Sequence, residues 1–314
     1  MDLTARYARY AADPASLPFP ERVTLELSDR CNLTCPMCPR EMRHGDGLMA
    51  WDLYERLARE VARHPGTALV PFFRGESLMH PRFLDALRLA KSLGISPVQL
   101  STNATLLTPE ISEILISLPL DFVSFSLDAF SPAAYEQQRR GADYTGVMAH
   151  VEDFLRIRAR EGGRLPEVQV SAVETALTAP EMEAFAAYWK PRVDRVRIYP
   201  QHSQDGAFGS LPDPHGARRA CGKPVTDLVV TCDGQAALCC HDWARRVPLG
   251  DLNLSTLEEV WRGAPYHAVR MSHHEGRWDA DPSCAGCDQW AQYWNPEGVV
   301  GRLVVGTPPW KGRA

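Results

Sequence analysis

The feature that most constrains the fold is an alternation of short apolar runs with amphipathic segments. The apolar runs are rich in β-branched residues and predict strands at 23–27, 68–73, 97–101, 122–127, 167–173 and 195–199. The stretches between them, such as 51–64 and 144–160, place apolar residues three and four apart, as helices do. Strands joined by helices form parallel sheets with right-handed crossovers. The pattern therefore predicts an α/β fold, a partial (β/α)6 barrel that is two strands short of a closed TIM barrel.

Polar or chemically specialised residues follow the predicted strands. The first strand leads into "CNLTCPMC", the second into "RGES", the third into "STNA" and the fourth into "LDA". In βα barrels the carboxyl ends of the strands form one mouth, and the chemistry takes place there. The sequence therefore predicts a single site at this mouth.

The character of the chain changes after the sixth predicted strand. The stretch 202–216 is rich in glycine, proline, serine and aspartate, which indicates a linker. Beyond it, "VVTCDGQAAL" predicts a hairpin that turns at Asp233 and Gly234. The expected division is an N-terminal extension at 1–19, the barrel at 20–205, a small cysteine-rich domain at 216–300 and a tail at 301–314.

Composition excludes several classes of function. The 314-residue chain is 45% hydrophobic and 23% charged, with a formal net charge of −5. These values give no basis for binding nucleic acid or an anionic membrane. The first twenty residues lack the continuous apolar segment of a secretion signal, so we expect a cytoplasmic protein with no membrane partner. Nine cysteines in groups fit metal ligation in a reducing cell better than disulfides.

Cys31, Cys35 and Cys38 form the tightest cysteine group, in the loop after the first predicted strand. Thiolates are soft ligands, and C-x3-C-x2-C spacing lets one loop hold three corners of a compact metal centre. Three interpretations are open: a zinc site with a distant fourth ligand, buried free cysteines, or an iron–sulfur cluster. The cluster fits best, because an iron without a protein ligand can bind a chelating substrate.

This loop resembles the motif of the radical S-adenosylmethionine (SAM) enzymes, whose three cysteines hold a 4Fe-4S cluster that binds SAM. "FFRGESLMHP" resembles the Gly-Gly-Glu segment of that family, although Arg74 replaces the first glycine. The resemblance implies that Glu76 accepts a hydrogen bond from the ammonium of SAM and that Gly75 permits close backbone approach. It further implies a 5′-deoxyadenosyl radical that takes a hydrogen atom from an unactivated carbon.

The resemblance also implies cofactor-binding residues at and beyond the ends of the third and fourth predicted strands. They are Ser101, Asn103, Ser126, Asp128 and Arg140. Two of them have structural alternatives. Asp128 is also suited to cap the following helix, and Arg140 with its neighbour Arg139 is also consistent with a solvated pair.

A second cysteine group lies in the predicted small domain. One cysteine before the hairpin, one after it and a final C-x2-C pair resemble the twitch or SPASM extension of radical SAM enzymes. The resemblance implies that a single auxiliary 4Fe-4S cluster is bound by Cys221, Cys239, Cys284 and Cys287. A zinc site is the alternative for four such ligands. The nearby "SHHEG", at 272–276, reads as a solvated helix end.

Cys240 directly follows a predicted ligand, so on a strand its side chain points away from Cys239. Related epimerases return a hydrogen atom to the substrate from such a thiol. Related dehydrogenases instead pass an electron to the auxiliary cluster and need no spare thiol. We expect Cys240 to be catalytic and the reaction to be an epimerisation, although a buried neighbour without function is the plain alternative.

The expected substrate is a carbohydrate-like intermediate of antibiotic biosynthesis, because no peptide-recognition module precedes the barrel. Oxidation of a secondary alcohol in an aminocyclitol or sugar is the first alternative, and peptide modification by an SPASM enzyme is the second. The resemblance implies an electron donor such as flavodoxin or ferredoxin.

Overall fold

The six predicted strands form and run parallel, as the alternation requires. The computed structural model describes residues 2–39, 47–162, 164–201, 217–294 and 301–306. Its barrel strands are β1 (Arg22–Leu25), β2 (Ala68–Val70), β3 (Gln99–Thr102), β4 (Phe122–Ser126), β5 (Glu167–Glu174) and β6 (Arg195–Pro200). β1 pairs with β2, β3 to β6 pair in sequence, and a bridge between Leu69 and Val98 joins the two sheets. This order confirms the partial α/β barrel.

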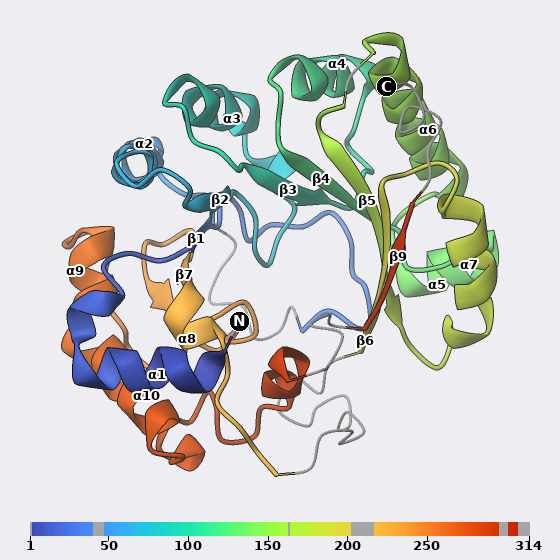
Figure 1. Ribbon diagram of the computed structural model, residues 1–314. Coiled ribbons are helices and arrows are strands. Elements are labelled where there is room, and N and C mark those ends of the chain that lie inside the picture. The colour runs from blue at the N-terminus through green and yellow to red at the C-terminus, as the bar shows by residue number, and fades with distance from the viewer. Residues whose placement is uncertain (1, 40–46, 163, 202–216, 295–300, 307–314) are drawn as a thin grey trace.

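Helices cover the outer side of the curved row of strands (Figure 1). They are α2 (Trp51–Ala62), α3 (Phe83–Ser92), α4 (Pro109–Ser117), α5 (Pro132–Gln138), α6 (Tyr144–Arg160) and α7 (Met182–Trp189). Local sequence fixes where they begin: the Thr108 side chain accepts a hydrogen bond from the Ile111 amide, and Asp143 accepts one from Gly146 at 2.7 Å. Buried residues recur three and four apart in α2 and α3, which is the spacing that predicted them.

The C-terminal part of the chain shares a sheet with the barrel. After α8 (Lys223–Thr226), β7 (Asp227–Val230) pairs in parallel with β1, and β8 (Ala236–Ala237) returns antiparallel to β7. This pairing confirms the predicted hairpin, and its turn uses Gly234 at a φ of +83°. The remaining elements are α1 (Leu3–Ala12), α9 (Leu257–Arg262), α10 (Ala264–His274) and β9 (Arg302–Val305), with short 3-10 turns at Pro14–Ser16, Ser77–Met79, Ala179–Glu181, Trp278–Ala280 and Gln289–Tyr293.

Elements from different predicted ranges pack together. β7 joins β1, α1 packs on α10, and β9 pairs antiparallel with β6. The division at 1–19, 20–205, 216–300 and 301–314 stays a prediction, and the predicted linker at 202–216 lies outside the described residues. Within the described ranges, no helix combines the length and apolar character needed to cross a bilayer.

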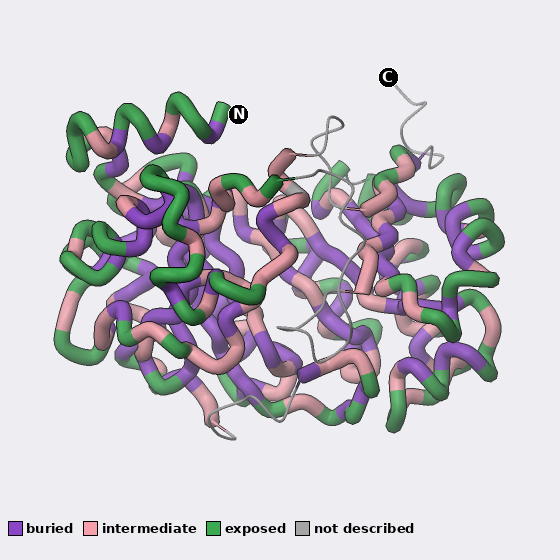
Figure 2. The backbone as a smooth tube through the Cα atoms, turned by 90° about the horizontal axis from the view of Figure 1, so that it is seen from below, coloured by how far each residue is buried: buried purple, intermediate pink, exposed green. Residues whose placement is uncertain are grey.

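A buried arginine ties the helices of the C-terminal part together. Arg270 of α10 is 1% exposed and donates to the carbonyl oxygens of Pro224 at 2.8 Å and Trp261 at 2.7 Å. Its guanidinium also lies 5.1 Å from the ring centroid of Tyr10, which belongs to α1. Figure 2 shows buried residues concentrated in the interior of the molecule and exposed residues along the outer turns of its helices.

We expect Leu228→Ala, in β7, to lower the free energy of unfolding by about 2–5 kcal/mol, because Leu228 is fully buried in the common core. Leu254→Ala is the matched control. Leu254 is 86% exposed, and its replacement should change stability by less than about 0.5 kcal/mol. Urea unfolding measures both variants, and equal costs would show that β7 is not part of the core.

Candidate functional site

The three-cysteine loop follows β1 at the carboxyl ends of the barrel strands. Its cysteines are free thiols, with Cys35 buried and Cys31 and Cys38 partly exposed. The Cys38 amide donates to the Cys35 carbonyl at 3.1 Å, which turns the loop back on itself. The Thr34 amide donates to the Arg140 carbonyl at 2.9 Å, so the segment between α5 and α6 also holds the loop.

Gly75 is the point at which the loop after β2 meets the cysteine loop. A Cβ atom at this position would lie 2.3 Å from the carbonyl oxygen of Ser28 and 2.5 Å from that of Arg30. The following residue, Glu76, donates its amide to the Arg30 carbonyl at 2.7 Å. The two loops therefore touch backbone to backbone, and only glycine fits. Contact of Gly75 with the cofactor itself stays a prediction.

Glu76 holds a buried carboxylate at the mouth. It is 3% exposed and accepts hydrogen bonds from Thr102 Oγ1 at 2.9 Å and from the amides of Asn103 at 2.8 Å and Leu78 at 3.3 Å. Burial raises the pKa of Glu76, and these donors oppose that rise. The carboxylate thus joins the loop after β2 to the end of β3. Its role as acceptor for the SAM ammonium stays a prediction.

Asn103 links the end of β3 to the cysteine loop. Its Nδ2 donates to Asn32 Oδ1 at 3.1 Å and lies 3.9 Å from Cys31 Sγ. Its Oδ1 accepts from the amide of Thr105 at 2.9 Å and from the Thr105 hydroxyl at 2.6 Å. The protein itself therefore orients this amide group beside the first cysteine.

Arg74, which departs from the family pattern, forms a buried ion pair. Its Nε and Nη2 donate to the two carboxylate oxygens of Glu26, just after β1, at 2.8 and 2.7 Å. The same carboxylate accepts from the Cys232 amide at 3.0 Å, and Arg74 Nη1 donates to the Trp243 carbonyl at 3.3 Å. Arg74 thereby joins the mouth to the C-terminal part. The sequence signal for it was Glu26 itself, an acid in an apolar strand that requires a buried partner.

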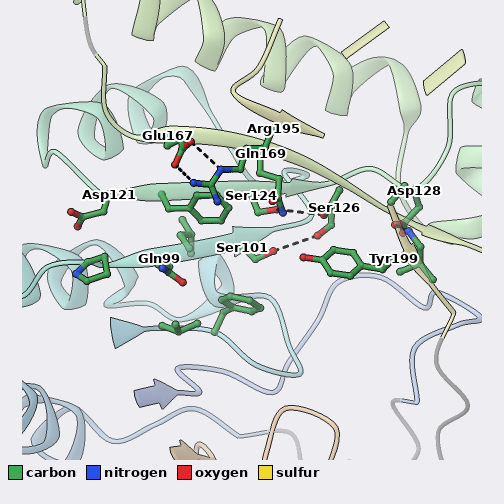
Figure 3. Close-up of a pocket in the computed structure, with 18 of the residues that line it drawn as sticks. Gln99, Ser101, Asp121, Ser124, Ser126, Asp128, Glu167, Gln169, Arg195 and Tyr199 are labelled. Atoms are coloured by element: carbon green, nitrogen blue, oxygen red, sulfur yellow. Dashed lines mark hydrogen bonds and ion pairs between the residues drawn. The ribbon is translucent and has the colours of Figure 1, made fainter. Parts of the chain in front are cut away.

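A cavity of about 600 Å³ extends from the mouth into the barrel (Figure 3). Its wall carries many polar groups among apolar ones, because β3 to β6 turn serine, glutamine and charged side chains inward at alternate positions. Strand register brings these side chains into rows, and one row is Ser101, Ser124, Gln169 and Arg195. The Ser101 and Ser126 hydroxyls are 3.4 Å apart, and Gln169 Nε2 donates to Ser124 Oγ at 3.1 Å. Two predicted site residues, Ser101 and Ser126, thus line one cavity.

Asp128 lies after β4 with a φ of +66°. Its Oδ1 accepts from the Val173 amide at 2.8 Å, and its Oδ2 is 2.5 Å from Nε of Arg139. It does not cap α5, which Ser131 caps. Arg139 lines the cavity together with Asp128, whereas the side chain of Arg140 is exposed. The structure therefore places Arg139 in the cavity wall, and binding of the cofactor by Arg140 stays a prediction.

The second cysteine group surrounds a small cavity in the C-terminal part. The lining includes all four predicted ligands, Cys221, Cys239, Cys284 and Cys287. Backbone amides donate to two of the sulfurs, from His241 to Cys239 at 3.4 Å and from Gln289 to Cys287 at 3.3 Å. Burial raises the pKa of Cys221 to about 12, so this thiol stays protonated until a metal replaces the proton.

His273 belongs to this site, and its assignment to a solvated helix end is wrong. It is 1% exposed, its Nδ1 accepts from the Cys221 amide at 3.1 Å, and its Nε2 lies 3.4 Å from Cys284 Sγ. Burial lowers the pKa of His273 to about 4, so the ring is neutral at pH 7. Because Nδ1 accepts, Nε2 carries the proton and directs it at the sulfur.

Cys240 lies beside this cavity and does not line it. It is half-buried next to His241 and Lys223, which lower its pKa although burial alone would raise it. Lys223 in turn pairs with Asp227 at 2.6 Å. Cys240 therefore lies near the start of β7, among charged side chains.

Two family models match the chain. The model of the Radical SAM superfamily matches residues 25–160, and the SPASM model, an iron-sulfur cluster-binding domain, matches residues 221–288. The first match includes the three-cysteine loop and the second includes the whole second group. Thiolates are the ligands that iron–sulfur clusters require, and all of these cysteines are free, so the donors fit. Among the described residues, no three Cys, His, Asp or Glu side chains lie close enough together to bind one metal ion. The first cysteine group is therefore defined by its shared loop and the second by its shared cavity.

Similar proteins differ in the molecules that they are named for or bound to. The tungsten-containing aldehyde ferredoxin oxidoreductase cofactor-modifying protein of Pyrococcus furiosus is 32% identical over 167 residues, which are 52% of this chain and 46% of that protein. BtrN in complex with AdoMet and 2-DOIA has a TM-score of 0.60 at 16% identity, over 86% of this chain and 93% of BtrN. Streptococcus suis SuiB bound to precursor peptide SuiA has a TM-score of 0.67 at 14% identity, over 84% and 71%. A GTP 3',8-cyclase of Synechococcus sp. is 39% identical over 114 residues, which are 33% of this chain and 33% of that protein. The two structures share the fold, and the chain spans less than half the length of these two curated relatives.

We expect Gly75→Ala to disrupt the three-cysteine site and to spare the second group, because the added methyl group would overlap the Ser28 and Arg30 carbonyls. After anaerobic reconstitution, its iron content should fall to that of a variant with the three loop cysteines replaced by alanine. Gly286→Ala is the control, since a Cβ atom there meets no atom within 4 Å. Wild-type iron content in Gly75→Ala would contradict the close contact.

We expect Arg74→Met to lower the free energy of unfolding by about 3–5 kcal/mol, because it leaves the Glu26 carboxylate buried without its partner. Adding Glu26→Gln removes that charge, so the double variant should recover part of the loss. Denaturant unfolding of the wild type, both single variants and the double variant measures the coupling. Additive losses would show that the two side chains do not interact.

Proposed function

We propose that this chain, which belongs to the radical SAM superfamily and carries an SPASM iron–sulfur cluster-binding domain, epimerises a carbon of a carbohydrate-like small molecule. The observation that carries the proposal is the cavity of about 600 Å³ inside the barrel, whose wall combines polar and apolar side chains. Its size suits a small molecule, and its wall offers many hydrogen-bonding groups.

The cavity extends from the end of the barrel that carries the three-cysteine loop toward the end that lies near the second cysteine group. At the mouth it is lined by Asp128, at the strand ends where the three-cysteine loop lies. At the opposite ends of the strands it is lined by Arg22. Arg22 is the register partner of Asp227 on β7, and Asp227 pairs with Lys223 beside Cys240. A substrate in the barrel would therefore lie between the two cysteine groups.

The inward hydroxyl groups suit a polyhydroxylated ligand. The Ser124 and Ser171 hydroxyls are 3.4 Å apart, as are those of Ser101 and Ser126. Hydrogen bonds between hydroxyl groups are usually near 2.7–2.8 Å, so these contacts are weak. A ligand hydroxyl placed among them can accept and donate at shorter distances. The cavity wall therefore gains better hydrogen bonds when a sugar or cyclitol binds.

When bound, SAM and its cluster supply the radical that removes a hydrogen atom from carbon. The chain's own residues orient the substrate and exclude water from the barrel. We assign the return of a hydrogen atom to Cys240, whose S–H bond breaks as a C–H bond forms on the opposite face of the carbon. One electron from a reductant such as flavodoxin or ferredoxin and one proton from the medium then restore the thiol.

Oxidation of a secondary alcohol is the second candidate. It is favoured by one observation: Cys240 is not among the residues that line the barrel cavity. An oxidation removes a second electron and a proton from the substrate instead of returning a hydrogen atom. The two reactions therefore differ in whether hydrogen from the medium reaches carbon.

We expect solvent deuterium at the attacked carbon when the reconstituted enzyme turns over sugars or aminocyclitols in deuterium oxide, because a thiol exchanges its proton with the medium. Cys240→Ala should still form 5′-deoxyadenosine and should lose the deuterium incorporation. Cys232→Ala, which removes a different thiol that is buried, should retain both. Mass spectrometry of product and nucleoside measures both outcomes.

A ketone product without deuterium would replace epimerisation by oxidation. Unchanged deuterium incorporation in Cys240→Ala would remove Cys240 as the donor. Failure of every polyol to elicit 5′-deoxyadenosine would exclude a carbohydrate-like substrate.

A further inference from the structure

The barrel cavity holds more positive than negative charge once its ion pairs are counted. Among the described residues three carboxylates line it, and each already has a cationic partner. The pairs are Asp128 with Arg139 at 2.5 Å, Glu167 with Arg195 at 2.5 Å and Asp121 with Lys91 at 3.0 Å. Any further arginine on this wall therefore lacks a carboxylate to balance it.

Arg197 is not among the residues that line the cavity, but its strand turns it to the same side as two that are. It lies on β6 between Arg195 and Tyr199, which both line the cavity, and alternation along the strand places it on the same face. It is half-buried, and its Nε is buried with no hydrogen-bond partner in the described part of the chain. Its guanidinium lies 5.1 Å from the ring centroid of Tyr199, a neutral neighbour that also forms a side-chain hydrogen bond with it, so the unsatisfied donor is Nε alone. A buried donor without a partner is costly, so this guanidinium favours a ligand that accepts hydrogen bonds.

The second arginine is Arg22. It lines the cavity from the start of β1, and it forms no ion pair with any carboxylate among the described residues. Its register partner on β7 is Asp227, whose carboxylate is already paired with Lys223 at 2.6 Å. Arg22 also acts on the Asp227 carboxylate and helps to lower its pKa, but Asp227 is shared with Lys223, so the positive charge of Arg22 is only partly balanced.

We propose that the substrate carries an oxyanion, a carboxylate or a phosphate, and that Arg197 binds it. Arg22 adds positive charge from the opposite edge of the open barrel. The guanidinium fork matches the geometry of two oxyanion oxygens. Strand register places Ser171 directly beside Arg197 and Ser126 next in the same row, so hydroxyl donors accompany the arginine. This inference rests on the proposed binding of a small polyol in the cavity and specifies its charge.

The test compares three probes that differ in one group: glucose, glucuronate and glucose 6-phosphate. Binding to the reconstituted enzyme with SAM, and without a reductant, is measured by isothermal titration calorimetry. We expect one of the two acids to bind at least about tenfold more tightly than glucose, because a charge-assisted hydrogen bond adds that much affinity. Whichever of the two acids binds more tightly identifies the oxyanion as a carboxylate or a phosphate.

Arg197→Gln should remove the preference for the acid and leave glucose affinity unchanged, whereas Arg197→Lys should retain part of it. Arg156→Gln is the matched control, because Arg156 is an exposed arginine of α6 that pairs with Asp153. The proposal would be overturned if neither acid bound more tightly than glucose, or if the preference for the acid survived Arg197→Gln. Since these measurements need no turnover, failure of the proposed reaction leaves their outcome unaffected. Turnover of a neutral polyol without a preference for acids would refute only the oxyanion site.

Discussion

The backbone contact between the loop after β2 and the loop after β1 fixes the geometry of the mouth. Gly75 lets the two loops approach each other closely, and the amide of Glu76 donates to the Arg30 carbonyl at 2.7 Å. The Glu76 carboxylate then reaches the end of β3, where Asn103 turns back to Cys31. Three strand ends are thereby held in one arrangement before any ligand binds. This is the preorganisation that a radical site requires, since its side chains position the reactants.

The C-terminal part is connected to this mouth by a shared sheet and a buried ion pair. β7 extends the barrel sheet beyond β1, and the Glu26 carboxylate receives both Arg74 and the Cys232 amide. A charge pair with no exposure contributes little net stability, but it is costly to break. The second cysteine group therefore keeps a fixed position relative to the barrel cavity.

The sequence predicted what depends on local pattern. Strands and helices followed from hydrophobic spacing, and the cysteine groups followed from their motifs. Neighbouring residues with the same chemistry could not be separated: Arg139 and Arg140 are adjacent, and the turn that ends α5 decides which one faces the cavity. His273 was misassigned because its partners, Cys221 and Cys284, are distant or outside its helix. Contacts of long sequence separation carry no local signal.

Strand β9 changes where another chain could add to the barrel. By pairing with β6 it occupies the hydrogen-bonding edge of the strand that carries Arg195, Arg197 and Tyr199. An extended peptide often binds by adding a strand to a free sheet edge. In the described part of the chain, β9 is the edge strand of this sheet, and it lies about 5 Å beyond β6. A peptide that added there would be separated by β9 from the strand that carries these three side chains.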